Sequence, residues 1–97
     1  MAKEDEGLIK RKPDAQRVQG KNETKGHDID GTIDFSVTNV GTETIWFGFL
    51  KDQRPDIPVN PGESSTWPLY RSCEVWDGEL FIRFGNTGSV ALITKTI

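Results

Sequence analysis

The chain has 97 residues, one cysteine and a formal net charge of −3. This length predicts one small domain, and its single cysteine excludes an internal disulfide framework and a metal site built of thiolates alone. The weak negative charge is atypical of a nucleic-acid binder, and no run approaches the roughly 18 apolar residues of a spanning helix. We therefore expect no membrane and no specific nucleic acid among the partners.

The first thirty residues differ in composition from the rest. Residues 1–30 contain no aromatic residue, and they carry equal numbers of basic and acidic side chains. Such a segment has too little apolar surface to offset the entropy lost on ordering. We predict a charged, flexible N-terminal arm over 1–30 and a β-sandwich domain over 31–97. The basic residues with which we expect the arm to contact a protein partner are Lys10, Arg11, Lys12 and Arg17.

The region 31–97 alternates between strand patterns and turn signals. Period-two patterns predict strands at 31–38, 43–50, 79–84 and 89–97. A further strand is predicted at 64–69, where Pro68 either restricts it to a sheet edge or ends it. Turns are predicted at 39–42, 60–63, 76–79 and 85–88, and a loop at 51–58. These elements predict an all-β fold, namely a small antiparallel β-sandwich or barrel of about six to seven short strands.

Residues 44–50, TIWFGFL, form the most apolar run of the chain. We assign Ile45, Phe47 and Phe49 to the core, because they share one face of the predicted strand. The opposite face carries Trp46, Gly48 and Leu50. A strand glycine often marks the close approach of another backbone. We therefore predict that these three residues receive either a neighbouring subunit or the chain's own arm.

Few other side chains are candidates for binding or catalysis. The aromatic residues Trp67, Tyr70 and Trp76 offer a possible platform for stacking on sugars, and for Trp67 packing in the core is the favoured interpretation. His27 is the only histidine and lies in the predicted arm, far along the chain from Cys73. Neither a metal site nor a catalytic constellation emerges, so we expect no enzyme activity, no catalytic residue, no bound metal and no cofactor.

Four stretches of the chain resemble a family of phage proteins. They are VTNVGTETIWFG at 37–48 with IPVNPGES at 57–64, ELFIRF at 79–84, and GSVALIT at 88–94. This succession of turns and strands is similar to small β-sandwich virion proteins of tailed bacteriophages, which occur as head decoration or cement proteins and as tail accessory domains. The resemblance covers residues 33–97. It implies an all-β domain without an active site.

The resemblance also implies a function and partners. It suggests a non-enzymatic structural protein that decorates and stabilises the assembled head, with the major capsid protein or another virion protein as partner. It further implies a homo-oligomer, for which we expect a trimer, and a place in the virion after assembly in the host cytoplasm. Two alternatives stay open: a tail, neck or fibre accessory protein, and a carbohydrate-binding β-sandwich module.

Overall fold

The computed structural model describes residues 12–68 and 74–97. This part of the chain contains eight strands and no helix, so no helix in it is long and apolar enough to cross a membrane. The strands are β1 (Pro13–Gly20), β2 (Thr24–Asp28), β3 (Asp34–Asn39), β4 (Ile45–Gly48), β5 (Ile57–Val59), β6 (Ser64–Pro68), β7 (Glu79–Phe84) and β8 (Ser89–Thr96). The predicted all-β fold is therefore confirmed.

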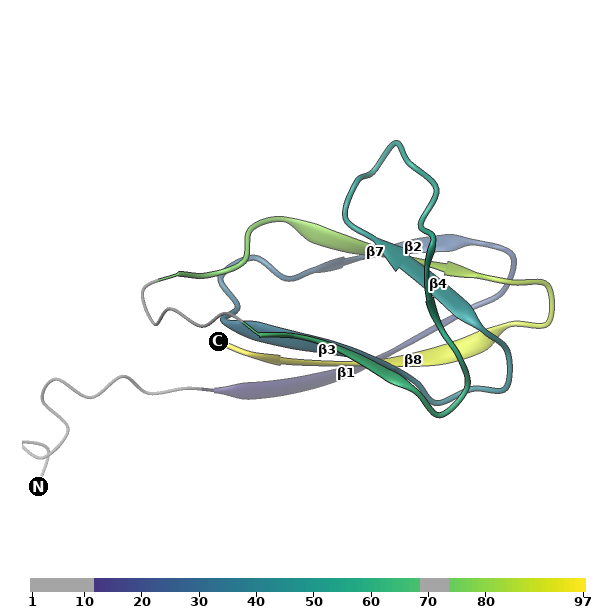
Figure 1. The fold of residues 1–97 in the computed structure, drawn as a ribbon, viewed down its shortest axis with the longest axis horizontal. Coiled ribbons are helices and arrows are strands. Elements are labelled where there is room, and N and C mark those ends of the chain that lie inside the picture. Colours follow the sequence, from purple (N-terminus) through teal and green to yellow (C-terminus); the bar gives the residue numbers. More distant parts are fainter. Residues whose placement is uncertain (1–11, 69–73) are drawn as a thin grey trace, which may run out of the picture.

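The strands form two four-stranded antiparallel sheets that face each other (Figure 1). One sheet has the order β1-β8-β3-β6 and the other β2-β7-β4-β5. The pairs are nested: β4 pairs with β5, β3 with β6, β2 with β7 and β1 with β8. A long hairpin that rolls up on itself produces this order. It is the topology of a double-sheet jelly roll, an architecture that viral capsid, lectin and cupin domains use.

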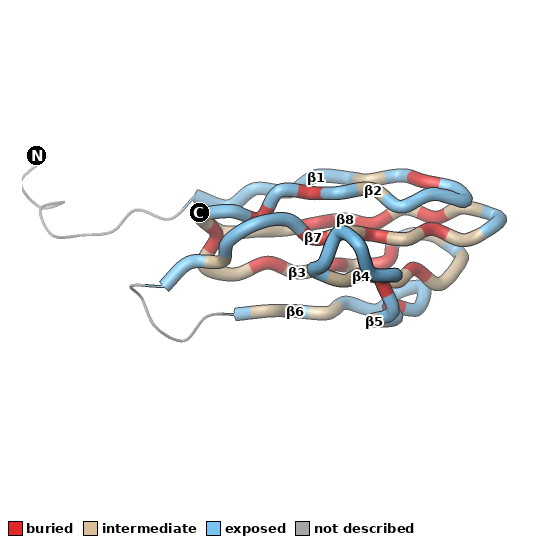
Figure 2. Tube along the Cα trace, turned by 90° about the horizontal axis from the view of Figure 1, so that it is seen from above, coloured by how far each residue is buried: buried red, intermediate tan, exposed pale blue. Residues whose placement is uncertain are grey.

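The core lies between the central strands of the two sheets. Figure 2 shows buried residues concentrated on β3, β4, β7 and β8, and few on β1 and β2. Buried apolar residues alternate with more exposed ones because successive side chains of a strand point to opposite faces. They are Ile29, Phe35, Val37, Ile45, Phe47, Val59, Leu80, Ile82, Phe84, Ala91 and Ile93.

The prediction of a flexible arm over 1–30 is wrong for residues 12–30. Strand β1 pairs with β8 along its whole length, β2 pairs with β7, and Ile29 is buried in the core. Backbone hydrogen bonds to these two strands offset the entropy of ordering a segment that has few apolar side chains. The domain therefore begins before residue 31. Residues 1–11, with Lys10 and Arg11, lie outside the described residues.

One end of the sandwich is fastened by Asn39, which is fully buried. Its Nδ2 donates to the carbonyl oxygens of Glu43 at 2.7 Å and Val59 at 2.9 Å. Its Oδ1 accepts from the Gly41 N–H at 3.0 Å and the Ser89 hydroxyl at 2.9 Å. One side chain thus connects β3 with segments of both sheets, and its amide hydrogen-bonding capacity is used.

Candidate functional site

The outer face of β4 does not leave Trp46 uncovered. The Arg83 guanidinium lies 4.0 Å from the centroid of the Trp46 ring, and Arg83 Nε donates to the Pro55 carbonyl at 3.1 Å. Strand β4 pairs with β7 in a register that places Trp46 opposite Arg83. The cation stabilises the ring through its quadrupole and covers part of it. Trp46 is consequently half-buried rather than free for a partner.

The gap at Gly48 is occupied by the chain itself. A Cβ added at Gly48 would lie 3.3 Å from the Cα of Pro55, which is buried. The expected close approach of a backbone is present, but the backbone belongs to the loop between β4 and β5. The prediction that a partner subunit or an N-terminal arm fills the space at Gly48 is therefore wrong.

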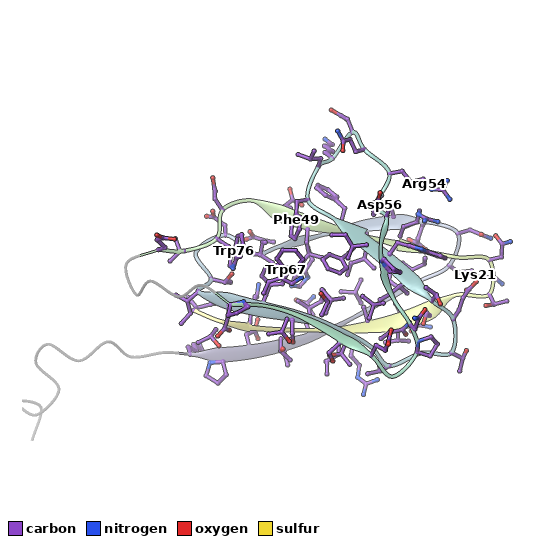
Figure 3. The ribbon with its side chains drawn as sticks, in the orientation of Figure 1. Lys21, Phe49, Arg54, Asp56, Trp67 and Trp76 are labelled. Carbon is purple, nitrogen blue, oxygen red and sulfur yellow. The ribbon has the colours of Figure 1, made fainter. Side chains whose placement is uncertain are left out.

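Apolar side chains of the β4–β5 loop remain exposed. Leu50 is 57% exposed and Phe49 is 36% exposed. This loop projects beyond the sandwich (Figure 1), and Arg54 and Asp56 lie along it (Figure 3). A small hollow of about 200 Å³ opens between Leu50, Arg54 and their neighbours. We call residues 49–56 the projecting loop.

Phe49, which we assigned to the core, belongs to a cluster of aromatic rings that extends from the core to the surface. The cluster consists of Phe35, Phe47, Phe49, Trp67 and Trp76. The Phe49 ring lies 5.3 Å from that of Trp67 and 5.9 Å from that of Phe47. Because β4 ends at Gly48, Phe49 covers the cluster from its rim instead of lying within the core.

The two described tryptophans of the expected sugar platform lie together, but they do not form a flat surface. The rings of Trp67 and Trp76 are 6.4 Å apart and inclined at 75° (Figure 3). Both indole N–H groups are used within the chain, at 2.9 Å to Ser65 Oγ and at 3.2 Å to the Trp67 carbonyl. This geometry favours packing within the domain over stacking on a sugar. Tyr70 and Cys73 lie outside the described residues.

The side of the sandwich bounded by β1 and β2 is closed by polar groups. The Lys25 ammonium reaches from β2 to the Gln19 carbonyl of β1 at 2.5 Å. Lys95 reaches from β8 to the Asp28 carbonyl of β2 at 2.8 Å. Each lysine thus bridges the two sheets and occupies a carbonyl oxygen at an edge strand. The predicted contact residues Lys12 and Arg17 are exposed on this same side, before and within β1.

His27 lies on β2, two residues after Lys25, and is 8% exposed. Its Nε2 is buried without a hydrogen-bond partner. Burial, and next the positive charge of Lys95, lower the pKa of His27 below its ordinary value of 6.5, while Asp28 and Asp14 oppose this shift. A neutral imidazole could serve as a metal ligand, but the described residues contain no group of three His, Cys, Asp or Glu side chains arranged to hold a metal ion.

A second, larger hollow lies on the outer face of the β1-β8-β3-β6 sheet. Its volume is about 400 Å³, and hydroxyls of Ser36, Thr66, Thr94 and Thr96 line it beside Asp34. Ser36 and Thr94 hydrogen-bond to each other across the strands, as do Thr38 and Ser64 at 2.6 Å. Two of the four hydroxyls that line the hollow, those of Ser36 and Thr94, are therefore already engaged with each other.

Sequence reasoning missed two of these features. Arg83 alternates with Leu80 and Ile82 and so signalled an outward side chain, but only the register of β4 against β7 pairs it with Trp46. The polar bridges of Lys25 and Lys95 carried no signal, because the strand to which Lys25 belongs was itself missed. Comparisons of the chain with models of protein families, with curated proteins and with solved structures found no match.

Proposed function

We propose that this chain is a non-enzymatic structural protein of a bacteriophage particle that decorates and stabilises the assembled head. The observation that carries the proposal is the nested order of eight strands, because the double-sheet jelly roll is an architecture of viral capsid domains. The resemblance of the turns at 37–48 and 57–64 to small phage virion proteins points in the same direction. A fold alone does not specify a function, so the contact surface must be tested directly.

The surface we assign to the shell contact is the projecting loop. Leu50 and Phe49 present exposed apolar area there, and such side chains serve as anchors when a partner buries them. Arg54 and Lys51 are exposed beside them and supply cations for acidic groups of the shell protein. This assignment replaces the expected face of Trp46, Gly48 and Leu50, of which Leu50 alone keeps a widely exposed side chain.

Binding of this kind stabilises a shell by mass action. A protein that binds the assembled shell but not its separated subunits shifts the equilibrium towards the shell. The effect grows with the free concentration of the protein relative to its dissociation constant. Heads that carry the protein should accordingly resist heat or denaturant better than bare heads do.

The test uses gradient-purified particles of the phage that encodes the chain, together with empty heads of that phage. We expect mass spectrometry to find the chain in the particles at a fixed ratio to the shell protein. Purified full-length chain should co-sediment with the empty heads, and Leu50→Asp should abolish this. Val40→Asp is the matched control, because Val40 is 44% exposed and lies in the turn after β3, where its N–H donates to the Val90 carbonyl of β8.

Two results would contradict the head assignment. Absence of the chain from purified particles would overturn a virion role altogether. Presence in particles without any binding to tailless heads would overturn decoration of the head and favour the tail, neck or fibre alternative. Equal binding by Leu50→Asp and the unmodified chain would show that another surface contacts the shell.

A further inference from the structure

Within residues 12–68 and 74–97, no strand pairs with the outer edge of β1, which is eight residues long. The other strands at sheet edges are shorter, with five residues in β2, three in β5 and five in β6. Side chains of β1 are exposed from Pro13 to Arg17. An open edge of this length is a template for pairing with another strand, and natural proteins control it through the residues they place there.

The register of β1 against β8 shows which backbone groups face outward. Lys12 and Ile97 exchange both backbone hydrogen bonds at 3.0 Å, immediately before the first paired residues of the ladder. In an antiparallel pair, residues alternate between bonding the neighbour and pointing away from it. Asp14, Gln16, Val18 and Gly20 therefore bond β8. The backbone groups of Pro13, Ala15, Arg17 and Gln19 point to the free edge.

The free edge carries a specific pattern of donors and acceptors. Its donors are the N–H groups of Ala15, Arg17 and Gln19, because proline has no N–H. Its free acceptors are the carbonyl oxygens of Pro13, Ala15 and Arg17, because Lys25 occupies that of Gln19. The missing donor and the occupied acceptor stand at opposite ends of the same edge.

We propose that two copies of this chain dimerise by antiparallel pairing of β1 with β1, about a two-fold axis at Gln16. In this register Ala15 pairs with Arg17 of the second copy, and Pro13 pairs with Gln19. Every free donor then meets a free acceptor. One position of the ladder lacks a hydrogen bond, because the Pro13 nitrogen has no hydrogen to donate. The Gln19 carbonyl that faces it already accepts a hydrogen bond from Lys25. The edge is self-complementary in its hydrogen bonds.

Neighbouring registers lack this match. An axis at Arg17 places two arginines directly opposite each other, which is destabilising, and points the Ala15 N–H at the occupied Gln19 carbonyl. An axis at Ala15 leaves the Arg17 carbonyl without a hydrogen bond, because it faces Pro13, which has no N–H to donate. The Gln16 register also sets the small Ala15 opposite the long Arg17 side chain. The dimer joins the two sheets that contain β1 into one continuous eight-stranded sheet.

This inference does not depend on the proposed function, and it has its own test. Analytical ultracentrifugation of the full chain should show a concentration-dependent dimer. Ala15→Pro should yield a monomer with unchanged circular dichroism, because a proline is tolerated where the N–H faces away from the ladder. Ala15→Ser keeps the N–H and should still dimerise. A monomer at every attainable concentration, a trimer, or a dimer unaffected by Ala15→Pro would overturn the proposal.

Cysteine cross-linking tests the register and does not depend on the proline variant folding. In a Cys73→Ser background, Gln16→Cys should oxidise to a covalent dimer faster than Ala15→Cys or Arg17→Cys. The Gln16 residues of the two copies would form a pair without mutual hydrogen bonds, with Cα atoms about 4.5 Å apart. This separation suits a disulfide. Preferential cross-linking at Ala15 or Arg17, or none at any of the three positions, would overturn the Gln16 axis.

Discussion

The side of the sandwich near β4 and β6 is filled by aromatic rings, whereas the side bounded by β1 and β2 is closed by lysine side chains. On the first side, Phe49, Trp67 and Trp76 extend the core to the surface through edge-to-face contacts. On the second, Lys25 and Lys95 bridge the sheets through backbone carbonyls. The same fold thus closes its two open sides with opposite chemistry.

The difference separates two sources of stability. Aromatic side chains bury large apolar areas and gain further from the geometry of their ring contacts. The polar side gains little from burial and depends on the backbone ladders β1·β8 and β2·β7. Inward-pointing polar side chains on edge strands also limit indiscriminate pairing with other chains. We infer that the aromatic side contributes most of the stability of the fold. The polar side controls which other strands can pair with its edge strands.

The largest effect is expected from Phe47→Ala. Phe47 is fully buried and contacts Phe49 and Trp67. Removal of its ring should lower the free energy of unfolding by about 3–5 kcal/mol, through lost burial and the cavity left behind. Urea denaturation followed by circular dichroism measures this. The exposed β1 residue Gln19→Ala is the control and should stay within about 0.5 kcal/mol of the unmodified chain.

Comparable losses from Phe47→Ala and Gln19→Ala would contradict the division between the two sides. The same would hold if Phe47→Ala left the unfolding midpoint unchanged. A change in the denaturant slope instead of the midpoint would indicate an altered unfolded or partly folded state, so both parameters should be fitted.

The next largest effect is expected from Asn39→Ala. This variant leaves the carbonyls of Glu43 and Val59 and the hydroxyl of Ser89 without the partner they have now. Buried polar groups without partners cost about 1–3 kcal/mol each, so we expect a loss of about 3 kcal/mol. Asn39→Asp would place a carboxylate oxygen against the same two carbonyl oxygens at a fully buried site, so it should lose at least as much stability as Asn39→Ala. A loss below about 1 kcal/mol for Asn39→Ala would contradict the role of this residue as a fastening point.

The comparison also explains what could be predicted from the sequence. Strands β3, β4, β7 and β8 were predicted from apolar residues at every second position, and burial alternates along each of them in the structure. Strand β6 lies at a sheet edge and ends at Pro68. The turn at 60–63 is confirmed: Glu63 N–H donates to the Asn60 carbonyl at 2.9 Å, and Gly62 has a φ of 82°. That is the type II geometry expected of Pro-Gly.

Strands β1 and β2 could not be predicted in the same way. The inward positions of β1 hold Asp14 and Gln16, so the pattern that marks a half-buried strand is missing. Their stability comes from strands far along the sequence, and composition alone does not report such pairing. The contacts of Trp46 and Gly48 were missed for a related reason, because Arg83 and Pro55 reach them only through tertiary register and loop path.

The polar side should make the fold sensitive to acid through His27. Its pKa is lowered in the folded state, so between pH 6.5 and that lowered pKa the unfolded chain binds more protons. The free energy of unfolding should accordingly fall as the pH is lowered from 7.5 to 5. His27→Leu should lack this component. If the unmodified chain and His27→Leu lose stability in parallel over this range, the buried imidazole does not control it.

The smallest effect concerns Lys95, whose ammonium lowers the pKa of His27 after the larger contribution of burial. Lys95→Met removes the charge and keeps the apolar stem, so the pKa of His27 should rise towards 6.5 without reaching it. The acid sensitivity should weaken in proportion. Because the chain has one histidine, its imidazole resonances in an NMR titration report this pKa directly. Lys25→Met, on the same side of the sandwich, should leave the pKa of His27 unchanged. Equal pKa shifts in the two variants would mean that the net charge of the chain, and not the position of Lys95, sets this pKa.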